Sequence, residues 1–351
     1  MNLPIKKSLA SSESYSSEDR PLDQDGWIYA DWNEFLFNPS LKVLEQLRSF
    51  DKISRYPNDN EKKLIDALSI YTNFNQENIS IYSGSDEALR DIFTTYLDND
   101  KSAIVFNPTY NQVKQLILSN TNSLIESKIN DPLEAHLYAF EEVEKADLVY
   151  LVNPNNPTGK LLNPGKIEKL ISSNKEKLFV IDEAYYEFSN NSLSPLIMKY
   201  DNLIITRTFS KAFGLAGLRI GYIITNKRII SDLKKIKNIK SVNSMATTAA
   251  ISVLDDINYY KNCIAEVLES KEMFYKKINE LHKLTIFRSE ANFLIIKTDD
   301  STKLINFLKE QKILVRNISK MYSLENCIRI TVGSIESSEK ILRHLAYYDQ
   351  N

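Results

Sequence analysis

One stretch of the chain combines a lysine with two hydroxyl side chains and an arginine. Thr208, Ser210, Lys211 and Arg219 follow an apolar run, residues 203–206, that is typical of a buried strand. Open α/β sheets bind ligands in loops at the carboxyl ends of their strands. A lysine with a lowered pKa can form a Schiff base with an aldehyde, and an arginine suits a phosphate. A surface loop with an exposed lysine is the alternative, and this stretch alone leaves both interpretations open.

Three further segments place polar side chains directly after predicted strands. Asn156 lies in a loop whose two X-Pro units stiffen the backbone. Asp182 follows a buried strand, and Tyr185 comes shortly after it. Ser85 and Asp86 open a predicted helix, where backbone N–H groups can bind an anion. Each segment also has a structural alternative: a plain turn for the loop, a helix N-cap for Asp182 and capping for Ser85.

Glycine is scarce, with 8 in 351 residues, and six of the eight fall within or beside these segments and near residue 333. A residue so rare is expected where the backbone must approach another group closely. The four segments together meet the needs of one cofactor, pyridoxal phosphate. It requires a lysine for a Schiff base, a carboxylate at the ring nitrogen, a hydrogen-bond donor at the ring oxygen and a phosphate cup.

The elements that must position these segments predict an α/β fold. Short apolar runs bounded by turn residues alternate with amphipathic stretches such as residues 86–97 and 164–173. This alternation predicts a large domain with a mostly parallel central sheet, covered by helices on both faces. The predicted strands lie at residues 78–82, 102–106, 148–152, 178–181, 202–206 and 218–224.

The pattern of predicted helices and strands changes after about residue 240. A long charged amphipathic segment, roughly residues 258–283, leads into predicted strands near 293–297 and 328–332. This order predicts a smaller α+β domain. We therefore expect three parts, which are an N-terminal arm at 1–30, a large cofactor-binding domain at 31–240 and a small C-terminal domain at 241–351.

Composition and charge exclude several classes of protein. The net charge is -2, without a basic block for nucleic acid or a polybasic patch for a membrane surface. No apolar run approaches the roughly 20 residues of a membrane span, and the N-terminus lacks the apolar stretch of a secretory signal. Two distant cysteines and three scattered histidines predict neither a disulfide framework nor a metal site. We expect a cytoplasmic protein.

From about Asn33 to Ser338 the chain contains motifs that resemble those of a known protein family. It resembles the fold-type-I pyridoxal-phosphate aminotransferases, and within them the histidinol-phosphate aminotransferases. The first resemblance rests on the lysine segment, on Asn-Pro-Asn-Asn-Pro-Thr-Gly at 153–159 and on Asp-Glu-Ala-Tyr at 182–185. The second rests on Arg-Tyr-Pro at 55–57, Gly-Ser-Asp-Glu at 84–87, Pro-Thr-Tyr at 108–110, Val-Arg at 315–316 and Arg-Ile-Thr-Val-Gly at 329–333.

The resemblance implies roles for the matching residues. Lys211 resembles the Schiff-base lysine and proton shuttle, and Asp182 the acid that keeps the ring nitrogen protonated. Asn156 and Tyr185 match the pair that holds the ring oxygen, and Lys211, Asp182 and Tyr185 are thereby expected to be catalytic. Tyr110 matches the aromatic residue that stacks on the ring, with a core tyrosine as its alternative. The phosphate cup is matched by Ser85, Asp86, Thr208, Ser210 and Arg219.

The resemblance also implies an assembly and a substrate pocket. Tyr56 matches a tyrosine that reaches the phosphate of the neighbouring subunit, which implies a homodimer with shared active sites. Arg329 resembles the arginine that binds a carboxylate or a phosphate, with Arg316 assisting. The two lie on strand-like runs that could pair antiparallel, although Arg316 could instead be a surface charge. Tyr15 and Asn33 stand in segments that line the substrate side.

The expected reaction exchanges an amino group between a phosphorylated amine and the 2-oxoglutarate/glutamate pair. Histidinol phosphate or a related compound is the expected amine. The segments on the substrate side depart from the family pattern, because Asn33-Glu34-Phe35-Leu36 lacks the usual proline and Lys240-Ser241 replaces a Pro-Tyr pair. Two alternatives stay open: decarboxylation of a phospho-amino acid, and amino transfer to another small phosphorylated substrate.

Overall fold

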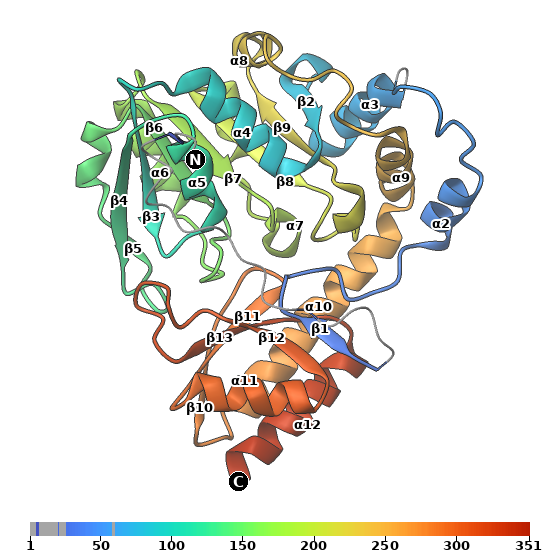
Figure 1. Ribbon diagram of the computed structural model, residues 1–351, viewed down its shortest axis with the longest axis vertical. Coiled ribbons are helices and arrows are strands. Elements are labelled where there is room, and N and C mark those ends of the chain that lie inside the picture. The colour runs from blue at the N-terminus through green and yellow to red at the C-terminus, as the bar shows by residue number, and fades with distance from the viewer. Residues whose placement is uncertain (1–4, 7–19, 21–25, 58–59) are drawn as a thin grey trace, which may run out of the picture.

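Two β-sheets of different size organise the chain (Figure 1). The computed structural model describes residues 5–6, 20, 26–57 and 60–351. The large sheet has eight strands in the order β2-β9-β8-β7-β6-β3-β4-β5, and the small sheet has five in the order β1-β12-β13-β11-β10. The predicted α/β architecture, with a mostly parallel sheet and a second smaller α+β unit, is confirmed.

The large sheet contains every strand predicted before residue 240. Strands β2, β3, β4, β6, β7 and β8 run in one direction, because β2 and β8 are both antiparallel to β9 and the others pair in parallel. Only β9 and β5 run the opposite way. The strands are β2 (Ile79–Tyr82), β3 (Ser102–Asn107), β4 (Ser123–Asn130), β5 (Leu137–Tyr138), β6 (Leu148–Val152), β7 (Leu178–Asp182), β8 (Leu203–Thr208) and β9 (Gly221–Thr225).

Strand β9 begins later than the sequence predicts. A short 3-10 turn, Ala216–Leu218, precedes it, and Arg219 takes a left-handed backbone conformation with φ of 52°. A residue in that conformation cannot continue the extended backbone of a strand. The strand therefore starts at Gly221, and Arg219 is left in the loop where its side chain can face a ligand.

Helices cover both faces of the large sheet. All residues of β6 are buried, and their side chains alternate between two apolar clusters, one on each face. Helices α4 and α8 contribute to one cluster and α6, α9 and α10 to the other. The helices preceding residue 240 are α2 (Leu41–Arg48), α3 (Asn60–Thr72), α4 (Gly84–Tyr96), α5 (Gln112–Leu118), α6 (Pro164–Ser173), α7 (Tyr186–Ser189) and α8 (Lys227–Leu233).

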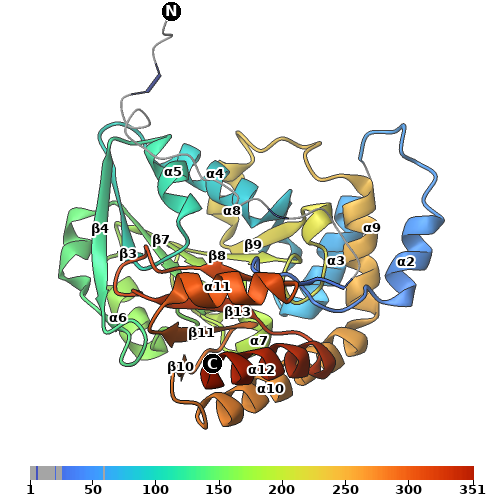
Figure 2. The same ribbon diagram turned by 60° about the horizontal axis from the view of Figure 1, so that its bottom comes forward.

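The small sheet is antiparallel except for its first strand, which pairs in parallel with β12. Helices α10, α11 and α12 pack around it, with α12 beside α10 (Figure 2). Its elements and the helix that precedes it are β1 (Ile28–Ala30), α9 (Ser244–Asp255), α10 (Ile257–Ile278), β10 (Leu284–Phe287), β11 (Phe293–Thr298), α11 (Ser301–Glu310), β12 (Ile313–Asn317), β13 (Cys327–Thr331) and α12 (Ile335–Gln350).

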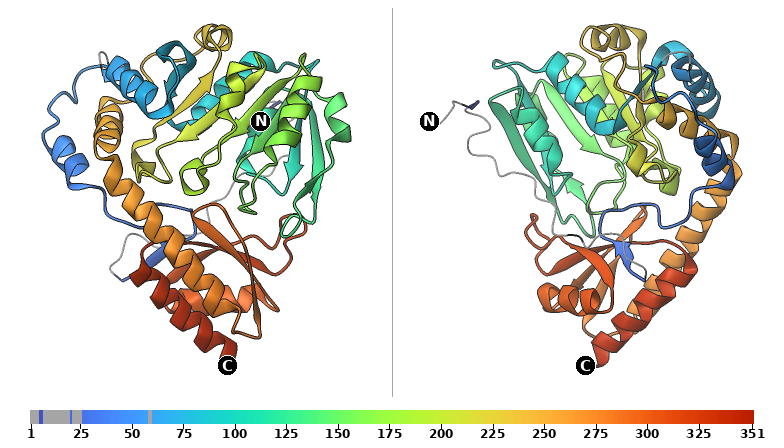
Figure 3. Two further views of the ribbon diagram at one scale, coloured as in Figure 1. Left: turned by 180° about the vertical axis from the view of Figure 1, so that it is seen from behind. Right: turned by 45° about the vertical axis from the view of Figure 1, so that its right-hand side comes forward.

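Two elements cross the borders expected from the sequence. Strand β1 lies within the stretch expected as an arm, yet it pairs with β12 of the small sheet. Helix α9 lies beyond residue 240, yet it packs against α2 and α3 of the large unit. Helix α10 then runs from the large unit to the small sheet (Figure 3). The division into three parts stays a prediction.

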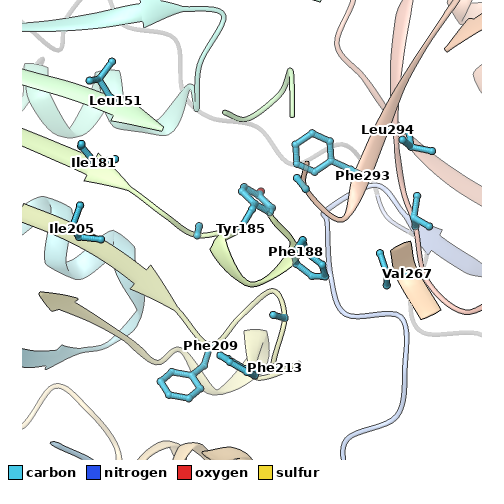
Figure 4. Packing of buried hydrophobic residues seen from close by; sticks show 14 of the residues in the cluster. Leu151, Ile181, Tyr185, Phe188, Ile205, Phe209, Phe213, Val267, Phe293 and Leu294 are labelled. Carbon is cyan, nitrogen blue, oxygen red and sulfur yellow. The ribbon is translucent and has the colours of Figure 1, made fainter. Parts of the chain in front are cut away.

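One apolar core continues from the large sheet into the small one. Leu151, Ile181 and Ile205 on neighbouring strands belong to the same cluster as Phe293 on β11 (Figure 4). The ring of Phe293 meets that of Tyr185 edge-on, with 5.2 Å between their centroids. This contact fixes the small sheet against the loops at the edge of the large sheet. No helix within the described residues has the length and apolar character needed to traverse a lipid bilayer.

Candidate active site

The loops predicted to carry chemistry meet at one edge of the large sheet. Strands β6, β7 and β8 are in parallel register, so that Val152, Asp182 and Thr206 lie side by side. Strand β2 runs in the same direction, and its carboxyl end therefore lies at the same edge. The small sheet faces this edge from below in Figure 1. Its strand β13 supplies Arg329, which reaches Asn156 across the gap between the two units.

Lys211 lies partly buried in the loop after β8. Its ammonium group donates to the backbone carbonyl of Trp32 at 2.9 Å and lies 5.9 Å from the ring centroid of Tyr185. Burial, together with the positive charge of Arg329, lowers the pKa of Lys211 from 10.5 to about 8. These contacts do not fit an exposed surface lysine. They suit an amine that reacts and exchanges protons near neutral pH.

Asp182 ends strand β7 and is only 4% exposed. Its carboxylate accepts hydrogen bonds from the hydroxyl of Tyr150 at 3.0 Å and from the N–H of Ala184 at 3.1 Å. Burial, with a smaller contribution from the charge of Asp86, raises the pKa of Asp182 to about 6. The alternative of a helix cap is wrong, because the next helix, α7, has Tyr185 as its N-cap. A buried carboxylate at this place suits a cationic ring nitrogen.

Two amides converge on the hydroxyl of Tyr185. The side chains of Asn33 and Asn156 donate to it at 2.9 and 3.3 Å. The position of Asn156 depends on its neighbour Asn155, which is buried and donates to Pro108 O at 3.0 Å and to Thr158 Oγ1 at 2.9 Å. The loop is therefore more than a plain turn. It holds an amide beside a phenol, which is the arrangement expected around a ring oxygen.

The residues expected to form a phosphate cup lie together. Thr208 and Ser210 share a hydrogen bond of 3.0 Å, and Arg219 donates to Ser210 Oγ at 3.5 Å and to Asp86 Oδ2 at 2.9 Å. Helix α4 begins at Gly84 with Ser83 as its N-cap, so capping does not explain Ser85. The backbone N–H groups at the start of this helix are available to an anion, as helix N-termini generally are.

Two glycines allow the close approach that this cup needs. A Cβ atom on Gly221 would lie 2.8 Å from the backbone nitrogen of Ser85 and 2.7 Å from Arg207 O. Strand β9 therefore lies directly against the start of α4. A Cβ atom on Gly84 would lie 2.9 Å from the guanidinium of Arg219, and the φ of Gly84, 79°, itself disfavours a side chain.

Tyr110 lies next to the cup and is partly buried. Its hydroxyl donates to Asp86 Oδ1 at 3.1 Å and lies 2.5 Å from Gln112 Oε1. The ring also packs against the apolar cluster that includes α4. Stacking of this ring on a cofactor stays a prediction.

The two arginines of the small sheet are direct neighbours. Strands β12 and β13 pair antiparallel, as the sequence predicts, and their register places Arg316 opposite Arg329. Side chains of opposed residues in such a pair lie on the same face of the sheet. Arg329 donates to Asn156 Oδ1 at 2.7 Å and to the carbonyl of Asp31 at 2.8 Å. Arg316 is partly buried beside it and is not an isolated surface charge.

One of the expected residues, Tyr56, is not brought to this site. Tyr56 is 74% exposed, and the ammonium of Lys240 lies 4.0 Å from its ring centroid. It lies on the connection between α2 and α3, so its contact with a neighbouring subunit stays a prediction. Tyr15 lies outside the described residues.

Three residues of the site are missed by the sequence analysis. Asp31 and Trp32 act through backbone carbonyls, which every residue carries, so no sequence signal exists for them. Tyr150 donates to Asp182 from inside strand β6. A signal for Tyr150 does exist, because its hydroxyl is the only polar side-chain group in an otherwise aliphatic run, Leu148–Val152.

The donor set fits pyridoxal phosphate. Lys211 offers an amine with a lowered pKa, and Asp182 a buried acid whose ionised form a cation would stabilise. Asn156 and Tyr185 offer donors for the ring oxygen. The cup offers Arg219, the two hydroxyl side chains and the close-packed start of α4 for a phosphate.

The sequence is similar to those of known aminotransferases. A family model described as aminotransferase class I and II matches residues 30–345. The chain is 37% identical over 323 residues to a dihydroxyacetone phosphate transaminase from Campylobacter jejuni. The aligned region covers 89% of this chain and 87% of the relative. It is 31% identical over 324 residues, with the same coverage, to a histidinol-phosphate aminotransferase from Methanocaldococcus jannaschii.

A solved structure shares the fold. It is the histidinol-phosphate aminotransferase from Sinorhizobium meliloti in complex with pyridoxal-5'-phosphate, with a TM-score of 0.82 at 25% sequence identity. The match covers 92% of this chain and 90% of that one.

Proposed function

Because the chain belongs to the aminotransferase class I and II family and depends on pyridoxal phosphate, we propose that it exchanges an amino group between a small phosphorylated substrate and the 2-oxoglutarate/glutamate pair. The observation that carries this proposal is the register of Arg316 and Arg329 on one face of the small sheet. A single guanidinium suits a carboxylate, whereas two neighbouring ones suit a dianionic phosphate better.

The side chains around the cofactor site supply the chemistry of amino transfer. Pyridoxal phosphate, when bound, draws electrons away from the carbon that bears the amino group. Lys211 is the residue that would hold the cofactor covalently and then move the proton at that carbon, which its pKa of about 8 permits. Asp182 would hold the proton of the ring nitrogen. Tyr185 and Asn156 would bind the ring oxygen.

The phosphorylated substrate is proposed as histidinol phosphate or a related compound. The name of the Methanocaldococcus relative supports this choice. A second candidate is dihydroxyacetone phosphate, favoured by the higher identity, 37%, to the Campylobacter transaminase. Decarboxylation of a phospho-amino acid would use the same cofactor and the same phosphate contacts. The test must therefore distinguish decarboxylation from amino transfer.

A substrate panel tests the proposal. The enzyme loaded with pyridoxal phosphate is incubated with 2-oxoglutarate and one of three donors: histidinol phosphate, 2-amino-1,3-propanediol phosphate or O-phosphothreonine. Glutamate and carbon dioxide are both measured, with the unphosphorylated donors as controls. We expect glutamate to form faster from a phosphorylated donor than from its unphosphorylated control. Equal rates with the unphosphorylated controls would refute phosphate recognition, and carbon dioxide without glutamate would identify a decarboxylase.

We also propose a homodimer. Large apolar side chains are exposed on α2, on α3 and on the loops that lead to α3 and α9, namely Leu41, Ile53, Tyr56, Ile70 and Ile239, each at least 74% exposed. Helices α2 and α3 both pack against α9, so these side chains belong to one region of the molecule. An apolar surface of this kind is typical of a subunit interface. Burial of Tyr56 there would carry it toward the site of the neighbouring subunit.

A further inference from the structure

Four consecutive residues, 31–34, form one wall of the active site, and the first three of them contact other residues of the site. The carbonyl of Asp31 accepts from Arg329 at 2.8 Å, and the carbonyl of Trp32 accepts from Lys211 at 2.9 Å. The amide of Asn33 donates to Tyr185 at 2.9 Å. The position of this wall therefore sets the positions of a lysine, an arginine and a tyrosine at once.

This wall carries two carboxylates where an anionic substrate is expected. The parallel register of β1 and β12 pairs Ala30 with Val315, so the next residue, Asp31, lies beside Arg316. Asp31 is only 7% exposed, and the side chain of Glu34, three residues on, is 31% exposed. The negative charge of Asp31 beside Arg316, and that of Glu34 in the same wall, would weaken the attraction of the site for a phosphate.

Arg20 faces both of these carboxylates. Its guanidinium lies 2.5 Å from Glu34 Oε2 and 3.3 Å from Asp31 Oδ1. The same group lies 4.3 Å from the ring centroid of Trp32 and 4.5 Å from that of Tyr29. Arg20 therefore contacts four residues, two acids and two aromatic rings, and only 20% of its side chain is exposed. Stacking between two rings while bridging two acids suits the planar guanidinium and not an ammonium.

We propose that Arg20 is a positioning residue that sets the specificity of the site for anionic substrates. Its single positive charge offsets one of the two negative charges of Asp31 and Glu34, so that Arg316 and Arg329 keep more of their attraction for an anion. It also fixes the wall that holds Lys211 and Arg329. The inference deepens the proposed function and rests on it, since it assumes a substrate that carries a phosphate.

The experiment compares Michaelis constants for charged and uncharged donors in the loaded enzyme. Arg20→Ala is expected to raise the KM for the phosphorylated donor on the order of tenfold, because the two carboxylates lose the guanidinium that pairs with them. The KM for the unphosphorylated donor is expected to stay within about twofold. A purely structural defect would change both KM values and kcat alike.

Removing the two uncompensated carboxylates as well should rescue the variant. Arg20→Ala combined with Asp31→Asn and Glu34→Gln removes all three charges, so that both carboxylates are gone together with the guanidinium, and it does not restore the stacking. We expect it to recover most of the lost affinity for the phosphorylated donor, and Arg20→Lys to recover less. Arg288→Ala is the matched control, because Arg288 also pairs with an acid, Glu272, at 2.6 Å and stacks on Tyr275 at 4.1 Å, but on the surface.

The outcomes separate this inference from the proposed function. If the wild-type enzyme turns over no phosphorylated donor, the proposed substrate is wrong, and the effect of Arg20→Ala on the KM for glutamate then decides the inference. If the wild type is active but Arg20→Ala leaves the KM for the phosphorylated donor unchanged, the inference is overturned. It is equally overturned if the triple variant shows no rescue while its urea unfolding matches that of the wild type.

Discussion

Replacing Asp182 by asparagine removes a charge that the fold keeps buried beside the cofactor site. In the protein without cofactor, burial raises the pKa of this carboxyl to about 6, against 3.8 for an exposed aspartate. Between those two values the native state holds a proton that the unfolded chain has lost. Stability therefore falls as the pH rises through this range, and ionised Asp182 is destabilising above it.

The size of this effect follows from the shift in pKa. Two pKa units correspond to about 3 kcal/mol, of which about 1 to 2 kcal/mol develops between pH 5 and pH 8. Asparagine does not titrate, so it avoids this cost. It cannot accept from both Tyr150 and Ala184 N–H, however, and the lost hydrogen bond costs about 1–3 kcal/mol at every pH.

Urea unfolding of the cofactor-free wild type and of Asp182→Asn at pH 5 and pH 8 separates the two contributions. Only the titration of Asp182 depends on pH, whereas the lost hydrogen bond does not. We expect the stability difference between the two proteins to shift by about 1 to 2 kcal/mol in favour of the variant at the higher pH. Asp349→Asn is the control: Asp349 is also buried, but backbone N–H groups of Lys283 and His282 lower its pKa, so no shift is expected in this range.

Binding of pyridoxal phosphate should favour the ionised carboxylate of Asp182 over the asparagine of the variant. A cationic ring nitrogen beside Asp182 stabilises its ionised form, so the cofactor should stabilise the wild type more than Asp182→Asn at pH 8. The variant should retain the fold and lose several orders of magnitude in kcat, since the ring nitrogen would lose its proton. A pH-independent stability difference, or turnover near that of the wild type, would refute a role of this buried charge at the cofactor.

Three further predictions concern the cofactor, the substrate arginines and the assembly. Borohydride reduction of the loaded enzyme should fix the cofactor on Lys211, and peptide mapping that finds it on Lys160, another lysine with a lowered pKa, would contradict the assignment. Arg329→Ala should weaken both half-reactions by about 2–4 kcal/mol, the range for losing one partner of a buried charged contact. Arg316→Ala should raise the KM for the phosphorylated amine more than that for glutamate in single-turnover kinetics, and equal effects would exclude a two-arginine phosphate site. Mixing inactive Tyr56→Ala with inactive Lys211→Ala subunits should restore part of the activity if sites are shared, whereas sedimentation of an active monomer would exclude the dimer.

The sequence by itself predicted the architecture and which residues meet at the candidate site. Lys211, Asp182, Asn156 and Ser85 each follow an apolar run, and parallel strands bring the loops at their carboxyl ends to one edge of a sheet. That geometry is general, so local sequence is enough to predict which side chains meet. It also predicted that Arg316 and Arg329 could be neighbours, and the pairing of β12 with β13 places them opposite each other.

Only the tertiary structure decided what surrounds those residues. Strand β1 is three residues long, too short to leave a periodic pattern, yet its pairing with β12 places Asp31 beside Arg316. The partners of Lys211 and Arg329 in this wall are backbone carbonyls, which carry no residue-specific signal. Arg20 reaches Glu34 from fourteen positions earlier in the chain. Contacts of this kind depend on how distant segments pack, because neither a motif nor a hydrophobic period records which carbonyl or which charge lies opposite.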